Sequence, residues 1–241
     1  MFHPQGPTLR ELAIEALSST RRGYDLLAPK FDHTPFRTPD AVLGAVAGSL
    51  AAAGPFGLGL DLCCGTGAAT AMLRPHCRQV VGLDFSRGML LAGRRQPALA
   101  GVELVQADAL ALPFGQTFDV VVSFGAFGHF LEREQPRMVA EVARVLRPGG
   151  RFVFVTATVP PAWSRRYWLG HAFNGAMQVR NRLVSPPFVM YYLTFLLPDA
   201  LRLLREAGLK VETRDLGGLP GMWRDLRLVT ATRDPQRGVT T

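Results

Sequence analysis

The stretch LDLCCGTGAAT, from Leu60 to Thr70, runs from an apolar segment containing an acid into two glycines and a string of small residues. Glycine lets a backbone adopt positive φ, and it leaves no side chain between the backbone and a ligand. Gly65 and Gly67 therefore predict a bend directly after a buried strand. A lone G-x-G pattern does not show whether such a bend is only a tight turn or also a ligand cradle.

Strand-like and helix-like segments alternate around this bend. Strands are predicted at 56–64, 79–85, 102–109, 118–127, 151–159, 210–217 and 226–233. Helices are predicted at 68–76, 86–99, 133–146 and 198–209, with Ser86 capping the second and the RPGG stretch at 147–150 ending the third. This alternation predicts an α/β fold with a mostly parallel sheet and helices on both faces. Ligands of such sheets bind beyond the carboxyl ends of the strands.

The chain of 241 residues divides into four predicted parts. Residues 1–55 form an N-terminal helical cap, 56–158 a nucleotide-binding core, 159–198 an insert, and 199–241 the C-terminal part of the core. The cap and the insert fall outside the strand–helix alternation. Both could therefore cover a site at the edge of the sheet.

Three acids stand at the carboxyl ends of the first three predicted strands. Asp84 is placed to accept the hydroxyls of a ribose, and Asp108 with Ala109 to contact an adenine. Asp61 would repel a phosphate but would suit an ammonium group. The third glycine of the dinucleotide fingerprint is also replaced, by Thr70. An adenosyl amino acid, S-adenosylmethionine (SAM), fits these features best.

Five ordered motifs, LDLCCGTG, VVGLDFS, VQADALALPF, FDVVVSFGAFGHF and VLRPGGRFVFV, resemble those of class I SAM-dependent methyltransferases of the small-molecule type. The resemblance covers about residues 20–158. It implies a Rossmann-like seven-stranded sheet with an antiparallel last strand, a helical lid after the fifth strand, SAM as cofactor and no metal. The cofactor contacts that it implies are Asp61, Cys63, Gly65, Gly67, Asp84, Phe85, Met89, Asp108, Ala109 and Phe124. Cys63 is a departure, because many members carry glycine there.

The stretch YDLLAPKFD resembles the segment that precedes the core in this family. The resemblance implies that Tyr24 closes over the cofactor. Arg37 could pair with the methionine carboxylate through a two-pronged ion pair, or it could be an ordinary surface arginine.

His129 is the histidine at the carboxyl edge of a predicted strand, and its ordinary pKa suits a base near neutral pH. A base is needed only where the acceptor must lose a proton. His129 is therefore a candidate catalytic base, although it could simply pack in its loop. Acceptor contacts are predicted for Phe127 beside the methyl group and for Trp163, Tyr167 and Tyr191 of the insert.

Between Glu141 and Asp199 the chain has seven arginines and no acid, and aromatic residues crowd the later part. A basic, aromatic lid would suit a small, largely hydrophobic or aromatic acceptor, with oxygen favoured over nitrogen or carbon as the methylated atom. It would also suit peripheral contact with an anionic membrane. Alternatively, the aromatic residues could form the core of the lid and a dimer contact.

The formal net charge of +8 leaves nucleic acid, membranes and acidic small molecules open as partners. Nucleic acid is not favoured, because the SFGAF stretch lacks the N/D-P-P-Y/F pattern of amine-directed nucleic-acid methyltransferases. Three cysteines without metal-ligand spacing, and no secretory h-region, favour a cytoplasmic protein. A non-catalytic SAM-binding regulatory partner and an RNA methyltransferase remain alternative hypotheses, and the oligomeric state is left open.

Overall fold

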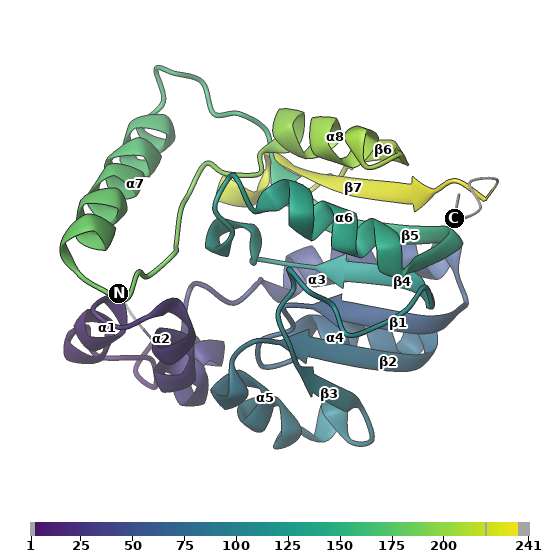
Figure 1. Cartoon of the computed structure of the whole chain (residues 1–241), viewed down its shortest axis with the longest axis horizontal. Coiled ribbons are helices and arrows are strands. Elements are labelled where there is room, and N and C mark those ends of the chain that lie inside the picture. The colour runs from purple at the N-terminus through teal and green to yellow at the C-terminus, as the bar shows by residue number, and fades with distance from the viewer. Residues whose placement is uncertain (1–2, 220, 236–241) are drawn as a thin grey trace.

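A mixed seven-stranded sheet forms the centre of the computed structural model, which describes residues 3–219 and 221–235 (Figure 1). Its order is β3-β2-β1-β4-β5-β7-β6, and β7 runs antiparallel to both of its neighbours. The strands are β1 (Phe56–Leu62), β2 (Cys77–Asp84), β3 (Glu103–Gln106), β4 (Phe118–Ser123), β5 (Leu146–Ala157), β6 (Leu209–Asp215) and β7 (Leu226–Arg233). The predicted α/β fold is therefore confirmed.

Eight α-helices surround the sheet and cover one end of it in the described part of the chain. They are α1 (Leu9–Ala16), α2 (Thr20–Leu27), α3 (Asp40–Ala53), α4 (Ala68–Leu73), α5 (Arg87–Arg94), α6 (Gln135–Val145), α7 (Arg165–Leu183) and α8 (Leu197–Glu206). Ser86 caps α5 as predicted, because its hydroxyl accepts a hydrogen bond from the Met89 amide at 3.1 Å.

Two layers of helices bury the two faces of the sheet. One face packs α3 and α4 against β1, β2 and β4, and the other packs α6 and α8 against the opposite sides of the same strands and β5. Every residue of β4 is buried, as expected for a strand of apolar residues covered on both faces. The central strands are thereby fixed, and their carboxyl ends come to one edge.

Two boundaries differ from the sequence predictions. The predicted cap, 1–55, includes α3, but Leu43, Val46 and Leu50 of α3 pack on the sheet, so α3 belongs to the core layer. The RPGG stretch does not precede a strand at 151 but lies inside β5. Gly149 has a φ of +76°, and the pairing of β4 with β5 shifts register there, which lets an irregular strand begin directly after α6.

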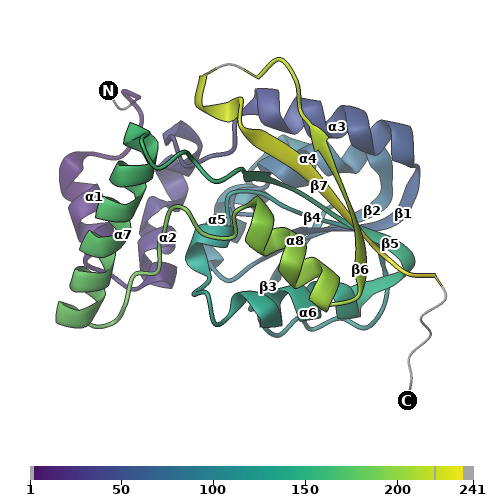
Figure 2. The same ribbon diagram turned by 90° about the horizontal axis from the view of Figure 1, so that it is seen from above.

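Helices α1, α2 and α7 gather at one end of the molecule, away from α8 and the far end of the sheet (Figures 1 and 2). The segment that returns from α7 to α8 passes between α7 and the core. We call residues 3–39 the cap and residues 159–196 the lid. Within the described ranges, no helix is both long enough and apolar enough to cross a bilayer. Residues 1–2, 220 and 236–241, parts of the predicted cap and C-terminal region, lie outside the described residues.

Candidate functional site

The bend after β1 contains three residues in the left-handed region: Cys63 (φ +61°), Gly65 (φ +55°) and Gly67 (φ +92°). At Gly67 the positive φ favours glycine, and an added Cβ would also displace the buried side chain of Leu99. At Gly65 an added Cβ would meet only the Phe31 ring, at 3.8 Å. The backbone is thus bare at Gly65 on its open side. Cys63 adopts a conformation that suits glycine, so its departure from the family pattern carries a cost in backbone strain.

Asp61 is the most deeply buried acid of the site, with 1 % of its surface exposed. Its Oδ2 accepts a hydrogen bond from the Thr70 hydroxyl at 2.6 Å. Burial raises the pKa of Asp61 to about 7, against the opposing effect of that hydrogen bond. Among the described residues, no arginine or lysine forms an ion pair with it. Thr70 stands where the dinucleotide fingerprint has its third glycine, and its hydroxyl orients the Asp61 carboxylate. Within the part of the chain that the structure describes, that carboxylate has no cationic partner.

Asp84 ends β2 and holds the glycine bend in place. Its Oδ2 accepts from the Gly65 amide at 2.8 Å and its Oδ1 from the Ser86 amide at 2.8 Å. Burial raises the pKa of Asp84 to about 6, although these backbone hydrogen bonds act to lower it. Asp84 therefore couples the first two strand ends, and its carboxylate retains further lone pairs for a ligand.

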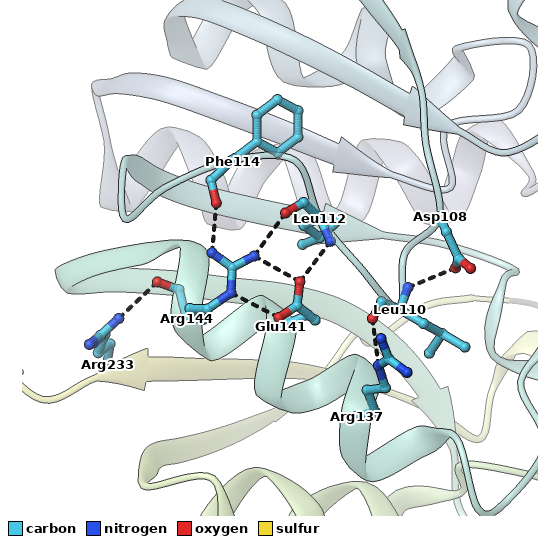
Figure 3. A network of polar contacts seen from close by, with 8 residues as sticks. All are labelled: Asp108, Leu110, Leu112, Phe114, Arg137, Glu141, Arg144 and Arg233. Atoms are coloured by element: carbon cyan, nitrogen blue, oxygen red, sulfur yellow. Dashed lines mark hydrogen bonds and ion pairs between the residues drawn. The ribbon is translucent and has the colours of Figure 1, made fainter.

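The loop after β3 carries Asp108 and Ala109 and is fixed from α6 (Figure 3). Asp108 accepts a hydrogen bond from the Leu110 amide at 2.8 Å. Further along the loop, the Leu112 amide donates to Glu141 at 2.6 Å, and Arg144 donates to the Leu112 carbonyl at 2.9 Å. The guanidinium of Arg144 also pairs with Glu141 and lowers the pKa of that carboxyl. This network gives the loop a defined path past the edge of the sheet.

Two cap residues that sequence reasoning missed attach the cap to this edge. Asp25 accepts from the Ser86 hydroxyl at 2.7 Å and from the Gly88 amide at 2.8 Å, at the start of α5. Asp32 accepts from the Thr66 hydroxyl at 2.6 Å, inside the glycine bend. Both acids stand in the YDLLAPKFD stretch that precedes the core, but no pattern within that stretch marks them as contacts of the edge.

Tyr24, His129 and Val189 form a hydrogen-bonded chain where the cap, the carboxyl end of β4 and the lid meet. His129 Nδ1 lies 2.7 Å from the Val189 carbonyl oxygen, which can only accept, so Nδ1 carries a proton. Burial lowers the pKa of His129, which favours the neutral ring. Its Nε2 then accepts from the Tyr24 hydroxyl at 2.6 Å, and burial raises the pKa of Tyr24 and keeps that donor protonated.

Other predicted cofactor residues lie around this edge. The Tyr24 ring lies near Phe85, with ring centroids 6.3 Å apart. Met89 and Phe124 are buried near the ends of β2 and β4. Arg37 pairs with Asp40 at 2.8 Å and approaches Asp32 at 3.7 Å, so its guanidinium already has carboxylate partners at the start of α3 and in the cap.

The predicted acceptor residues are not all brought together. Tyr191 lies beside the β4 end, because its amide donates to the Gly128 carbonyl at 2.8 Å. Phe127 instead stacks on Phe195 at 4.4 Å between ring centroids and is part of the buried core. Tyr167 packs within α7 against its neighbours Trp168 and His171. Trp163 is 88 % exposed, so the structure puts it on the outside of the lid.

Within the described part of the chain, no group of three or more His, Cys, Asp or Glu side chains could hold a metal ion. The acids at the edge bond instead to amides and hydroxyls from the bend and the cap. The arrangement can bind a cationic, hydroxyl-bearing ligand and can move a proton at the β4 end.

Comparison with known proteins agrees with this geometry. Residues 60–150 match a family model described as a methyltransferase domain. A demethylmenaquinone methyltransferase of Beutenbergia cavernae is 36% identical over 193 residues, covering 74% of this chain and 77% of the relative. A protein of the same name from Clavibacter sepedonicus is 46% identical over 108 residues, but this match covers only 42% of each chain. The solved DhpI-SAH complex superposes with a TM-score of 0.67 at 20% identity, covering 95% of this chain and all of that one, and so supports the fold.

Proposed function

The chain belongs to the class I SAM-dependent methyltransferase family, and on that premise we propose that it methylates a small, largely apolar aromatic molecule bearing an acidic hydroxyl group. The observation that carries the proposal is the Tyr24–His129–Val189 chain. It places a neutral imidazole, already oriented by a backbone carbonyl, at the β4 end beside the cofactor edge. Such a group is useful where an acceptor must lose a proton.

The residues at the sheet edge fit the cofactor. The buried Asp61 carboxylate lacks a cation that the methionine ammonium would supply, and Asp84 has acceptor capacity for ribose hydroxyls. Gly65 leaves the backbone bare for the methionine end, and we assign Asp108 with Ala109, in the loop after β3, to the adenine. Bound there, SAM supplies a methyl group activated by the adjacent sulfonium charge.

The chain's own contribution to the reaction is positioning and proton transfer. Holding an acceptor in line with the methyl group supplies much of the acceleration in such displacements. As the acceptor hydroxyl gives its proton to the Tyr24 oxygen, the Tyr24 proton passes to His129 Nε2. The resulting imidazolium keeps its Nδ1–H bond to Val189. The acceptor is left as an aryloxide, which is nucleophilic at its oxygen and at the adjacent ring carbon.

The aromatic character of the acceptor is supported from two sides. The lid contributes Tyr191, whose amide bonds to the Gly128 carbonyl, and the cap contributes the Tyr24 ring, which lies edge-on to His129. The curated relatives carry the name demethylmenaquinone methyltransferase, which indicates an apolar quinone as their acceptor. We therefore assign the substrate class of this chain to quinols and similar hydroxylated aromatics.

The experiment is a methyl-transfer assay with labelled SAM and a reduced, short-tailed 1,4-naphthoquinol. Label in the organic product supports the proposal, and mass spectrometry of the product distinguishes an aryl ether from a ring-methylated quinol. SAM binding without transfer to any hydroxyaromatic would instead support a non-catalytic SAM-binding partner. Salt-sensitive RNA binding with methylated RNA as product would support the RNA methyltransferase alternative.

Replacement of His129 by Gln and of Tyr24 by Phe tests the proton path. Each change is expected to lower kcat by roughly 100-fold or more, the usual contribution of a general base, and the double variant should be little worse than either. SAM affinity should stay within about threefold for His129→Gln, because the base contacts the acceptor side. The exposed His171 of α7 is a matched control, and His171→Gln should leave kcat unchanged.

The pH profile separates a base from a merely structural histidine. In the wild type, kcat should rise with pH through the lowered pKa of His129 and then level off, because the neutral ring is the active form. In His129→Gln, kcat should not show this rise with pH. If His129→Gln keeps both the rise and a near-normal kcat, the proton path is contradicted.

A further inference from the structure

Helix α7 presents an apolar face to solvent along its whole length. Its outward residues recur at helical spacing, which puts them on one side of the helix. We call this set the α7 stripe: Trp168, Ala172, Ala176, Val179 and Leu183. Trp168 is 65 % exposed and Leu183 is 79 % exposed. An amphipathic helix in a water-soluble protein normally buries such a face, so this exposure needs an explanation.

The other side of α7, its inner side, makes the contacts with the protein through small, polar and aromatic residues, and its Phe173 ring lies 4.7 Å from the Tyr192 ring between centroids. Gly170 is buried against Leu193, and Asn174 exchanges hydrogen bonds with the backbone of Tyr192. Asn181 bonds in the same way to the backbone of Phe188. The helix is therefore held by this inner side, and the α7 stripe is left without a cover among the described residues.

The exposure extends over the same end of the molecule. Trp163 and Leu169 of the lid, and Leu9 and Leu17 of the cap, are all more than half exposed. The two segments are adjacent, because Arg180 of α7 donates to the Ala16 and Ser18 carbonyls at the end of α1 (Figure 2). Outside the cap and the lid, Leu91 of α5 is the large apolar side chain exposed to a comparable degree in the described ranges.

The charged residues of α7 itself, and of the chain on either side of it, have one sign. No acid occurs between Glu141 and Asp199, and Arg165 and Arg182 are exposed at the two ends of the helix. Two copies of the protein packed together through the α7 stripe would bring their arginines close to one another, and this repulsion disfavours self-association through the stripe. Exposed tryptophan and arginine around an apolar stripe instead match the boundary between anionic headgroups and acyl chains.

We propose that the α7 stripe docks the protein on the surface of an anionic lipid bilayer, with α7 lying in the headgroup plane. The inner side of the same helix holds the segment 188–195, whose Val189 carbonyl contacts His129. Docking would therefore bring the acceptor side of the protein next to the bilayer, where apolar molecules dissolve. The docking itself does not depend on which molecule is methylated.

Sedimentation of the full chain with vesicles tests the docking. Vesicles of phosphatidylcholine and phosphatidylglycerol should retain the protein roughly tenfold more strongly than phosphatidylcholine alone, since each arginine near an anionic surface contributes to binding. High salt should remove most of this difference. Equal retention by both kinds of vesicle, or retention by neither, would overturn the proposal.

Matched substitutions locate the surface. Trp168→Ser with Leu183→Ser, and separately Arg165→Gln with Arg182→Gln, should each lower retention by roughly tenfold. Leu91→Ser, and Arg94→Gln with Arg95→Gln, change exposed residues of α5 and of its C-cap and should have no effect. All variants should keep the wild-type unfolding midpoint and affinity for S-adenosylhomocysteine. Unchanged retention of the Trp168→Ser and Leu183→Ser double variant would contradict docking. So would light scattering that shows a dimer for the wild type and a monomer for this variant, because the α7 stripe would then be a dimer contact.

Discussion

The cofactor edge of the sheet and the cap–lid end are held together in different ways. At the edge, carboxylates bind hydroxyls and amides that are close in sequence: Thr70 lies nine residues from Asp61, and Gly65 nineteen from Asp84. At the cap–lid end, Tyr24 meets His129 across 105 residues, and Arg180 meets Ala16 across 164. The edge is thus part of the core, whereas the acceptor side exists only when three separate segments meet. Asp25 and Asp32 connect the cap to the edge, so changes that leave these two acids in place should act on one region and spare the other.

The largest expected effect separates ligand binding from stability at the edge. Asp61→Asn removes the charge but leaves an oxygen for Thr70 to bond, and it should weaken SAM binding at pH 8 by roughly 10- to 100-fold, through loss of a charge-assisted hydrogen bond. The same change should raise the unfolding free energy of the ligand-free protein by roughly 1–3 kcal/mol, since it relieves a buried charge. Calorimetry and urea unfolding measure the two effects.

The raised pKa of Asp61 also predicts how the stability of the ligand-free protein changes with pH. Because its pKa is raised to about 7 in the folded protein, Asp61 binds more protons folded than unfolded between pH about 4 and 7. Ligand-free stability should therefore fall as pH rises through that window, while SAM binding should strengthen. Asp84 and Glu15 have raised pKa values and act in the same direction, so the difference between wild type and Asp61→Asn isolates Asp61. Identical slopes in both proteins would contradict the assignment.

A smaller effect is expected at the cap–lid end. Arg180→Ala removes donors to the Ala16, Ser18 and Pro186 carbonyls and should cost roughly 1–3 kcal/mol of stability. Hydrogen exchange should accelerate in α1 and α2, with SAM affinity unchanged within about twofold. The neighbouring Arg182 is exposed, so Arg182→Ala should change none of these. A large loss of SAM affinity in Arg180→Ala would show that the two regions are not independent.

The smallest effect concerns the strained bend. Cys63 has a φ of +61°, which costs a non-glycine residue roughly 1–2 kcal/mol. Cys63→Gly should therefore be more stable than Cys63→Ala by about 1 kcal/mol, because both lose the thiol and only glycine removes the strain. Urea denaturation of the pair measures the difference. Equal stability, or a more stable alanine variant, would count against strain at this position.

The same contrast explains what the sequence could predict. The cofactor edge could be predicted from local features: glycines after a strand, acids at the ends of successive strands, and a Ser86 cap. Each of these features is a short-range sequence pattern, and they occur along the chain in the order of the family's motifs. The seven strands, and the placement of helices on both faces of the sheet, could be predicted from the alternation of strand-like and helix-like segments. Asp25 and Asp32 were missed because their partners, Ser86 and Thr66, lie far along the chain and no periodicity signals them.

The cap–lid end shows that residue type alone does not say where a side chain lies. Phe127 and Trp163 are aromatic residues in suggestive places, but Phe127 fits a gap between Phe154 and Phe195, and Trp163 faces solvent. The sequence predicted α3 as part of the cap because nothing local distinguishes a helix that packs on the sheet from one beside it. Such assignments depend on packing, which is decided over the whole chain.

Titration of the folded protein with S-adenosylhomocysteine in a calorimeter tests the central claim, that the bare bend and the Asp61 and Asp84 carboxylates hold the cofactor. The wild type should show saturable single-site heat, and Asp84→Asn should bind at least roughly 10-fold more weakly while keeping its fold by circular dichroism, because a ribose acceptor loses its charge. No heat with the wild type, or equal affinity in the variant, would contradict the account.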